Sequence, residues 1–425
     1  MPDIEALPPE RKDSWLRKLG PGLITGAADD DPSGIATYSQ AGAQFGFNIL
    51  WTVLFTYPLM VGIQIVSARI GRVSGHGLAT NIRRHYPAWL LYGVVSLLLI
   101  ANTINIAADV SAMGEALKLI IGGSAQLYAV AFGVGSLLLQ VLIPYRRYVR
   151  ILKWLTLALL AYVATAFVVH IPWSQVLLKA LLPQLSWQPT YITTIVAVFG
   201  TTISPYLFFW QASQEVEEQL ADPQAQPLIK APQQAQADFS RIKLDTYIGM
   251  GFSNLVAFCI ILTTAVTLHL HGVTDIQTSA QAATALRPIA GDFAFMLFSA
   301  GIIGTGLLAI PVLAGSSAYA MAGAFKWRNS LERTPMQAKQ FYGIIIISTL
   351  VGIALGFTSI DPIKALFWSA VINGVISVPI MVLMMLMAVR PEIMGQFVIT
   401  RRLKVLGWLA TLMMAAAVAA MLVTL

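Results

Sequence analysis

Asp29-Asp30-Asp31-Pro32-Ser33-Gly34 interrupts an apolar stretch, Pro21 to Phe47, that is long enough to cross a lipid bilayer. Charged side chains at bilayer depth are costly, so three in a row do not belong in an ordinary spanning helix. Pro32 lacks an N–H and clashes with the preceding turn, while Gly34 tolerates an open backbone. We therefore predict two half-helices joined by an unwound segment, whose free carbonyl groups and carboxylates form a cation site. A loop or a helix end at the membrane surface is the alternative interpretation.

The composition is that of a polytopic membrane protein. Of the 425 residues, 57% are hydrophobic and 11% are charged, whereas soluble domains are about 25% charged. Residues 1–20 are polar and contain neither an apolar core nor a cleavage site, so we expect no signal peptide. The single cysteine, Cys259, excludes an intramolecular disulfide and a cysteine-cluster metal site.

Eleven segments are apolar and long enough to span a membrane, which takes about 20 residues. They are 21–46, 49–70, 88–113, 124–144, 151–170, 191–214, 245–268, 293–322, 340–358, 362–388 and 403–424. If the N-terminus is cytoplasmic, 23 of the 27 Lys and Arg residues fall on the cytoplasmic tail and loops or at the adjoining helix ends. The net charge of +7 therefore reflects topology and does not indicate nucleic-acid binding. We predict a multi-pass protein of the inner (plasma) membrane with its N-terminus inside and its C-terminus outside.

A Pro/Gln/Ala-rich linker at residues 221–234 follows the sixth segment and divides the chain into two halves. We predict a single transmembrane transporter domain over residues 1–425. It comprises a cytoplasmic N-tail (1–20), a first repeat (21–170), a second repeat (191–388) and an extra helix (403–424).

The sixth segment contains a second interruption, Gly200-Thr201-Thr202-Ile203-Ser204-Pro205-Tyr206. The first and sixth segments hold corresponding places in the two halves and would cross the membrane in opposite directions. Interrupted segments at matching places in two inverted halves indicate the binding site of a transporter. This pairing argues against a simple loop at the first interruption.

The two interruptions resemble the Nramp family of divalent-metal transporters. That family's first-helix signature reads Gly-Pro-Gly, then Asp-Pro-Gly-Asn, then Gln-Ala-Gly. Here the matching stretches are Gly20-Pro21-Gly22, Asp31-Pro32-Ser33-Gly34 and Gln40-Ala41-Gly42. The resemblance implies an all-α membrane protein with the leucine-transporter fold, which has ten core helices in a 5+5 inverted repeat, here with one further helix. Helices 1 and 6 of that fold are broken.

The departures from the family pattern concern the metal ligands. The family aspartate is kept as Asp31, but its asparagine is replaced by Gly34. In the sixth helix the family has Ala-x-x-Met-Pro-His, with the methionine sulfur on the metal, and the matching residues here are Thr201, Ser204, Pro205 and Tyr206. Thioether ligands favour softer metals, whereas carboxylate, carbonyl and water suit Mg²⁺. Mg²⁺ usually keeps several waters, and smaller side chains would leave room for them, as in the Nramp-related magnesium transporters.

Other polar residues at membrane depth are candidates for supporting roles. Asp109 matches a family glutamate on the proton route, but the acidic residue that would precede it by one turn is replaced by Ile106. A structural hydrogen-bonding role for Asp109 is an equal alternative. Asn373 is a candidate metal-site residue, with helix packing as the alternative. The five histidines lie near segment ends or in loops, and Tyr206, a phenol, does not titrate near neutral pH.

The sequence therefore predicts a carrier of hydrated Mg²⁺, and of Mn²⁺ as a further substrate, that works by alternating access without proton coupling. Asp31 supplies the main charge, and the remaining predicted metal-site residues are Asp30, Gly34, Thr201, Ser204 and Asn373, with Asp109 and Tyr206 as proton or supporting residues. No cofactor beyond the transported metal is expected, and the partners are the metal ion and the bilayer, with no obligate protein partner.

Three alternative functions are open at this point. A proton-coupled Mn²⁺/Fe²⁺ importer would show a preference for Cd²⁺ that a sulfur-free site should lack. A sodium-coupled amino-acid symporter of the same fold needs a half-helix N-terminus that receives a carboxylate, and three aspartates there would repel it. A membrane enzyme is disfavoured because the sequence shows no nucleophile–base pair or metal-hydrolase spacing at depth.

Overall fold

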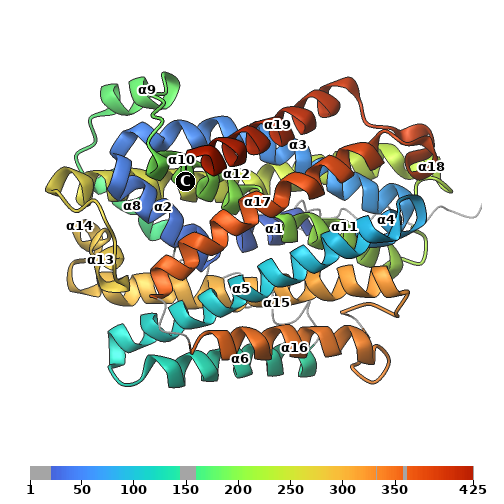
Figure 1. Ribbon diagram of the computed structural model, residues 1–425, viewed down its shortest axis with the longest axis horizontal. Coiled ribbons are helices and arrows are strands. Elements are labelled where there is room, and N and C mark those ends of the chain that lie inside the picture. Colours follow the sequence, from blue (N-terminus) through green and yellow to red (C-terminus); the bar gives the residue numbers. More distant parts are fainter. Residues whose placement is uncertain (1–20, 144–158, 332, 358–360, 425) are drawn as a thin grey trace, which may run out of the picture.

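The structure is a computed structural model that describes residues 21–143, 159–331, 333–357 and 361–424, and this part of the chain contains helices and no strands. Figure 1 shows long helices that run side by side. The longer helices are α1 (Pro21–Asp29), α2 (Pro32–Phe45), α3 (Leu50–Ser74), α5 (Ala88–Ile121), α6 (Ala125–Leu142), α8 (Leu160–Val168), α9 (Trp173–Leu181), α10 (Pro189–Thr202), α11 (Pro205–Ala221), α12 (Ala235–Thr267), α15 (Ala294–Phe325), α16 (Lys339–Leu355), α17 (Pro362–Ala388) and α19 (Arg401–Thr424). Short helices at their ends are α4 (Leu78–His85), α13 (Ser279–Thr284), α14 (Arg287–Ala290) and α18 (Pro391–Met394).

Eight helical segments of the described chain are long and apolar enough to cross a membrane, by length and composition alone. The first of them runs without a gap from Pro32 to Ser74, because α2 and α3 are joined by the short 3₁₀ helix η2 (Gly46–Ile49). The predicted ninth span is α16, an apolar helix of 17 residues. The N-tail (1–20) and residues 151–158 of the fifth span lie outside the described residues, so the total of eleven spans stays a prediction.

Both predicted interruptions are present. The first broken segment consists of α1 and α2, and the second consists of α10 and α11. Each half-helix that follows a break begins at a proline, Pro32 or Pro205, where the missing N–H is no loss and the fixed φ suits the first helical turn.

The broken helices pack reciprocally against the unbroken ones. α1 and α2 pack against α12, and α10 and α11 pack against α3. Small residues allow the closest approaches, because a Cβ at Gly26 would overlap the backbone of Gly249, and a Cβ at Gly200 would overlap the backbone of Ala370 and Gly374. The division of the chain into repeats at 21–170 and 191–388 stays a prediction, but the breaks are held in the centre of one helical body.

Within the described residues, connections predicted to be cytoplasmic meet at one end of the bundle. α4 and α18 lie at the right in Figure 1, whereas α9, α13 and α14 lie at the left. The backbone N–H of Leu228 donates to the carbonyl of Arg72 (3.3 Å), and Arg390 donates to the carbonyl of His85 (3.1 Å). We refer to this end as the α4 end and to the opposite one as the α13 end.

Candidate functional site

Asp31 is the N-cap of α2. Its extended backbone (φ −67°, ψ 172°) turns the carboxylate back over the first turn of the helix, where Oδ1 accepts hydrogen bonds from the backbone N–H of Gly34 (2.8 Å) and from Ser33 Oγ (2.6 Å). An aspartate in this position satisfies a backbone donor and meets the positive end of the helix dipole. The local sequence Asp-Pro-Ser-Gly therefore fixes the carboxylate at the break.

The second oxygen of Asp31 connects α2 to two other helices. Oδ2 accepts from Asn105 Nδ2 on α5 (2.9 Å) and from the Tyr206 hydroxyl on α11 (3.3 Å). The Tyr206 hydroxyl also lies 3.1 Å from the carbonyl oxygen of Ala28, at the end of α1. The Asp31 side chain is buried, and all four of its donors are neutral, so they orient the carboxylate without cancelling its charge.

Asp29 and Asp30 face a different helix. The Ser253 hydroxyl on α12 hydrogen bonds to Asp29 Oδ2 and lies 3.2 Å from Asp30 Oδ1. The other oxygen of each carboxylate, Asp29 Oδ1 and Asp30 Oδ2, is buried without a hydrogen-bond partner among the described residues. The three consecutive aspartates thus divide between two walls of the break, with Asp30 beside α12 and Asp31 beside α5 and α11.

The second break presents hydroxyl groups that bond to their own helix. Ser204 Oγ donates toward the carbonyl oxygens of Gly200 (2.7 Å) and Thr201 (2.8 Å), which would otherwise be free at the end of α10. The two breaks meet at Thr201, because a Cβ at Gly34 would lie 3.2 Å from Thr201 Oγ1 and 3.3 Å from the carbonyl oxygen of Asp29. Gly34, Thr201 and Asp31 are therefore neighbours, while the Ser204 hydroxyl is directed to the α10 backbone.

Further polar oxygens around the breaks are buried and have no partner among the described residues. Both carboxylate oxygens of Asp109 on α5 are in this state, and so is Oδ1 of Asn105, one helical turn away. Both amide atoms of Asn373 on α17 are also without a partner, beside the contact of Gly374 with Gly200 on α10. Buried polar groups are normally hydrogen-bonded, so these unpartnered acceptors, together with the donor Nδ2 of Asn373, indicate a place that water or a hydrated ligand fills.

Asn105 and Ser253 hydrogen bond to the aspartates of the first break, but neither was assigned to the site from the sequence. Asn105 precedes Asp109 by four residues and so shares its helix face, which is a signal that the sequence does carry. Ser253 lies 224 residues from Asp29 on an apolar helix, and no local pattern marks it. The described residues contain no group of three or more His, Cys, Asp and Glu side chains that could hold a metal ion.

The five histidines lie at helix ends or in connections. His76 stands between α3 and α4, and burial together with Arg84, Arg83 and Lys230 lowers its pKa, so that it is neutral at pH 7. The Nδ1 atom of His269 lies 2.8 Å from the carbonyl oxygen of Ala43, at the α13 end. None of the five contacts Asp31 through a hydrogen bond among the described residues.

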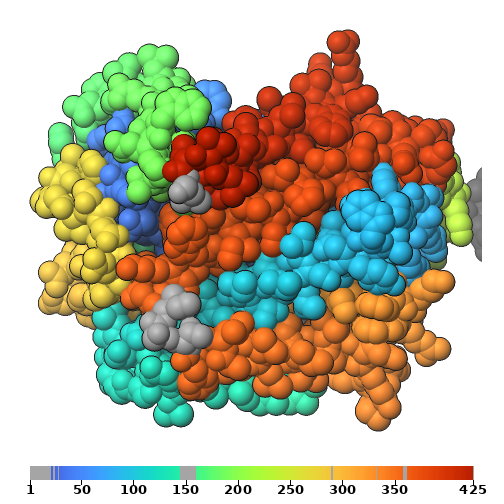
Figure 2. Space-filling model, in the orientation of Figure 1, coloured from blue at the N-terminus to red at the C-terminus, as the bar shows by residue number. Residues whose placement is uncertain are grey.

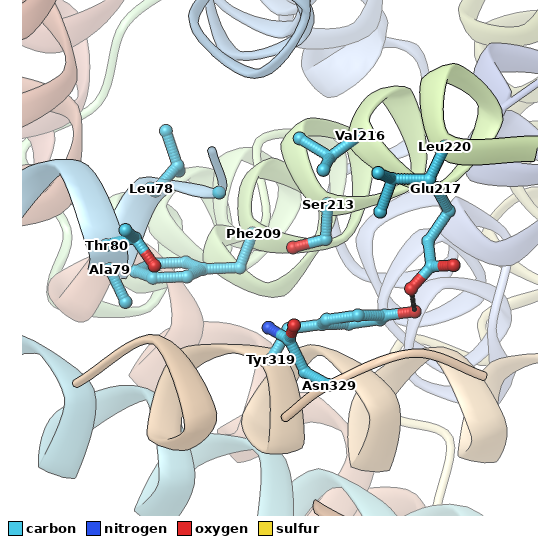
Figure 3. A pocket seen from close by; sticks show the side chains of 11 residues that line it. Leu78, Ala79, Thr80, Phe209, Ser213, Val216, Glu217, Leu220, Tyr319 and Asn329 are labelled. Atoms are coloured by element: carbon cyan, nitrogen blue, oxygen red, sulfur yellow. Dashed lines mark hydrogen bonds between the residues drawn. The ribbon is translucent and has the colours of Figure 1, made fainter. Parts of the chain in front are cut away.

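The acidic residues at the α4 end of α11 are bonded to neighbouring elements. A small hollow of about 30 Å³ lies at the α4 end, and beside it the Tyr319 hydroxyl on α15 donates to Glu217 Oε1 (3.0 Å). Figure 3 shows the two side chains and the hydrogen bond between them. Ser330 Oγ donates to the other oxygen of Glu217 (2.8 Å). Glu215 and Glu218 both form ion pairs with Arg241 of α12. These bonds fasten α11 to its surroundings on the α4 side of the breaks.

The comparisons with known proteins agree with this geometry. Residues 22–424 match the family model Nramp, described as natural resistance-associated macrophage protein-like. The manganese transporter of Eremococcus coleocola, solved in complex with an aromatic bis-isothiourea substituted compound, is similar with a TM-score of 0.71 and 20% identity, covering 98% of this chain and 90% of that one. A histidine-to-alanine mutant of the same transporter gives a TM-score of 0.73 at 18% identity over 99% and 89% of the two chains. MhsT in complex with L-phenylalanine is similar with a TM-score of 0.59 and 12% identity over 95% and 98%.

Proposed function

The chain belongs to the Nramp family, and from this premise we propose that it transports hydrated Mg²⁺, with Mn²⁺ as a further substrate, by alternating access and without proton coupling. Asp31 supplies the main charge, and Gly34 and Thr201 form the narrow contact between the two breaks. Asp30 and Asn373 complete the polar surroundings, and Ser204 holds the end of α10 in place. We further propose that the membrane is the inner (plasma) membrane, with the N-terminus in the cytoplasm and the C-terminus outside.

The observation that supports a hydrated ion is the set of unpartnered oxygens around Asp31. The four lone-pair positions of Asp31 are already taken by Ser33, Gly34, Asn105 and Tyr206. A bare ion would have to displace these donors, of which only the two hydroxyl groups can rotate away. The waters of a hydrated ion are hydrogen-bond donors, and Asn105 and Asp109 offer buried acceptor oxygens without partners in the described chain.

The ligand chemistry also favours a hard metal. The side chains that hydrogen bond to Asp31 offer oxygen ligands and no sulfur, and Ser204 and Tyr206 occupy the positions of the family's methionine and histidine. Oxygen ligands and water suit Mg²⁺ and Mn²⁺ better than the softer Cd²⁺. The observation that favours a second candidate, a Mn²⁺ importer, is the similarity to the Eremococcus coleocola manganese transporter, which at 20% identity concerns the fold alone.

The test is uptake into liposomes that contain the purified full-length protein and a fluorescent metal indicator. We expect saturable Mg²⁺ uptake, slower Mn²⁺ uptake, and inhibition by Cd²⁺ that is no stronger than inhibition by Mn²⁺. The experiment is run with and without a pH gradient, and empty liposomes provide the leak rate. Uptake of Mn²⁺ and Cd²⁺ with no Mg²⁺ uptake above the leak would contradict the proposal and support the manganese importer.

A further inference from the structure

A second cavity, partly lined by polar side chains, lies at the α13 end, outside the contacts of Asp31. Its volume is about 310 Å³, and it is bounded by α2, α10, α17 and the connection between α12 and α13. In Figure 2, blue atoms of the first helices lie recessed at the left, between green, gold and orange surfaces. The hollow at the α4 end, at about 30 Å³, is much smaller than this cavity.

The cavity wall exposes more apolar than polar surface, with Phe367 and Trp368 among its apolar residues, and its polar side chains add hydrogen-bond acceptors. The polar side chains that matter here are Gln40, Gln44, Thr190, Thr193, Thr194 and Asp275. Gln40 holds the connection against α2, since its Oε1 accepts from the backbone N–H of Ile276 (2.9 Å) and its Nε2 lies 3.4 Å from Asp275 Oδ1. Gln277 Nε2 donates to the other oxygen of Asp275 (3.2 Å), so two neutral partners position this exposed carboxylate at the cavity.

The size and the ligands of the cavity suit an ion that keeps its water. Six waters occupy about 180 Å³ at roughly 30 Å³ each, which the cavity accommodates. A single carboxylate among amide and hydroxyl groups does not supply enough charge to remove the water molecules from a strongly hydrated divalent ion. These groups can, however, accept hydrogen bonds from its waters. Among the described lining residues Lys364 is cationic, and it should weaken the attraction.

A polar face of α2 leads from this cavity to the break. Gln44, Gln40, Thr37 and Ser33 follow one another at intervals of four, three and four residues and so share one helix face. Gln40 and Gln44 line the cavity, Ser33 donates to Asp31, and the Thr37 hydroxyl between them is buried without a partner in the described chain. Thr190, Thr194 and Thr201 of α10 are spaced by four and seven residues and run in the same direction along a second face.

We propose that this cavity is an entry site that binds a divalent cation with its first hydration shell intact, before the ion reaches Asp31. The inference rests on the proposed function in so far as the transported ion is a hydrated divalent metal. Asp275 is its charged group, Gln40 and Gln44 bind the waters, and the polar face of α2 connects the site to the break.

The test uses hexaamminecobalt(III), whose inert ammonia shell imitates a hexahydrated cation and cannot be replaced by protein ligands. Binding to the purified full-length protein is measured by isothermal titration calorimetry. We expect one site in the wild type, and affinity about tenfold weaker in Asp275→Asn, since one charged hydrogen-bond acceptor is lost. Asp292→Asn is the matched control, because Asp292 is an exposed acidic residue in the connection between α14 and α15, outside the cavity lining, and it should bind like the wild type. Lys364→Met should bind more tightly.

Asp31→Asn separates the two sites and the two proposals. It should lose Mg²⁺ uptake but bind the cobalt complex with wild-type affinity. Absence of binding to the wild type would overturn the entry site, as would equal affinities for Asp275→Asn and Asp292→Asn. Loss of binding in Asp31→Asn with normal binding in Asp275→Asn would place the complex at the break and would also overturn it. If Asp275-dependent binding is found in a protein that transports no Mg²⁺, the entry site stands and the proposed substrate is wrong.

Discussion

Both interrupted segments resume at a proline, Pro32 in the first and Pro205 in the second, but the residue before each proline is used differently. Asp31 caps the helix that follows it and extends its second oxygen to α5 and α11. Ser204 makes no capping bond to the following helix and instead bonds to the carbonyls of the helix before it. In the first break the Asp31 carboxylate therefore faces neighbouring helices, whereas in the second break the Ser204 hydroxyl bonds to backbone carbonyls of its own helix.

From this difference we infer different roles for the two breaks. A buried charge with neutral partners attracts a cation strongly, because the surroundings screen it poorly. Hydroxyl groups that bond to their own helix add little attraction and mainly determine how much space is left. We infer that the first break determines whether a cation binds, and that the second break determines which cation fits.

The largest expected effect comes from removing the charge of the first interrupted segment. Asp31→Ala should reduce Mg²⁺ uptake to the leak rate of empty liposomes, because the ion loses its main counter-charge. The same change removes a helix cap, which costs about 1 kcal/mol of stability, so the melting temperature of the purified protein should fall slightly. Asp31→Asn keeps hydrogen-bonding atoms at this position and should fold normally, yet it should also fail to transport.

The control is Glu115→Gln at the α13 end of α5, which removes an acidic residue that pairs with the exposed Lys118. It should transport at the wild-type rate. Wild-type uptake by either Asp31 variant would refute the assignment of Asp31 as the main ligand.

The sequence was sufficient to find the breaks and not sufficient to find their partners. Aspartates, prolines and glycines inside apolar stretches carry a local signal, so the break before Pro32 and the break before Pro205 were predicted at the correct positions. Asn105 and Ser253 contact the break from helices 74 and 224 residues away, and that proximity is a property of the packing.

The sequence also did not predict that Asp29 and Asp30 face α12 while Asp31 faces α5 and α11, for a related reason. Successive residues on a helix point about 100° apart, but this rule fails where the helix ends. Whether Asp30 points with Asp29 or with Asp31 depends on where α1 stops, and α1 stops at Asp29. The cavity at the α13 end was likewise not predicted, since its wall combines three helices and a connection from both halves of the chain.

The second prediction changes the break that we expect to control selectivity. Ser204→Met adds a soft sulfur ligand and occupies space that waters would use, so the ratio of Mg²⁺ to Cd²⁺ uptake should fall by about tenfold, as one added ligand interaction of 1–2 kcal/mol would give. Ser204→Ala is the matched variant, because it also loses the bonds to Gly200 and Thr201 but adds no sulfur. Uptake of both metals from a mixture, measured by mass spectrometry, gives the ratio directly.

Adding Gly34→Asn to Ser204→Met should sharpen the effect. The position of the new Cβ lies 3.2 Å from Thr201 Oγ1 and 3.3 Å from the Asp29 carbonyl oxygen, so the larger side chain must push the two breaks apart or fill the gap between them. If the double variant keeps the wild-type ratio of Mg²⁺ to Cd²⁺, ligand softness does not control selectivity here.

The smallest expected effect concerns proton coupling, which would require a titratable route away from Asp31. Tyr206 occupies the position of the family's histidine, and the five histidines lie at helix ends or in connections. Asp109 is an acidic residue on α5 close to Asn105. The second acidic residue that such a route would need one turn earlier is replaced by Ile106. Protons can still compete with the metal for Asp31 at low pH, but such competition does not move protons across the membrane.

We therefore expect Mg²⁺ to enter liposomes down its own gradient without acidifying the interior. The measurement uses a pH-sensitive dye inside the liposomes during Mg²⁺ influx, with the membrane potential clamped. Asp109→Asn removes one acceptor for the waters of the ion, so it should slow uptake by no more than about threefold, the effect of one weak hydrogen bond, and it should leave the dye signal flat. A metal-dependent acidification in the wild type that disappears in Asp109→Asn would show that a proton route through α5 operates, and the site would then contain two functional carboxylates on two helices instead of one.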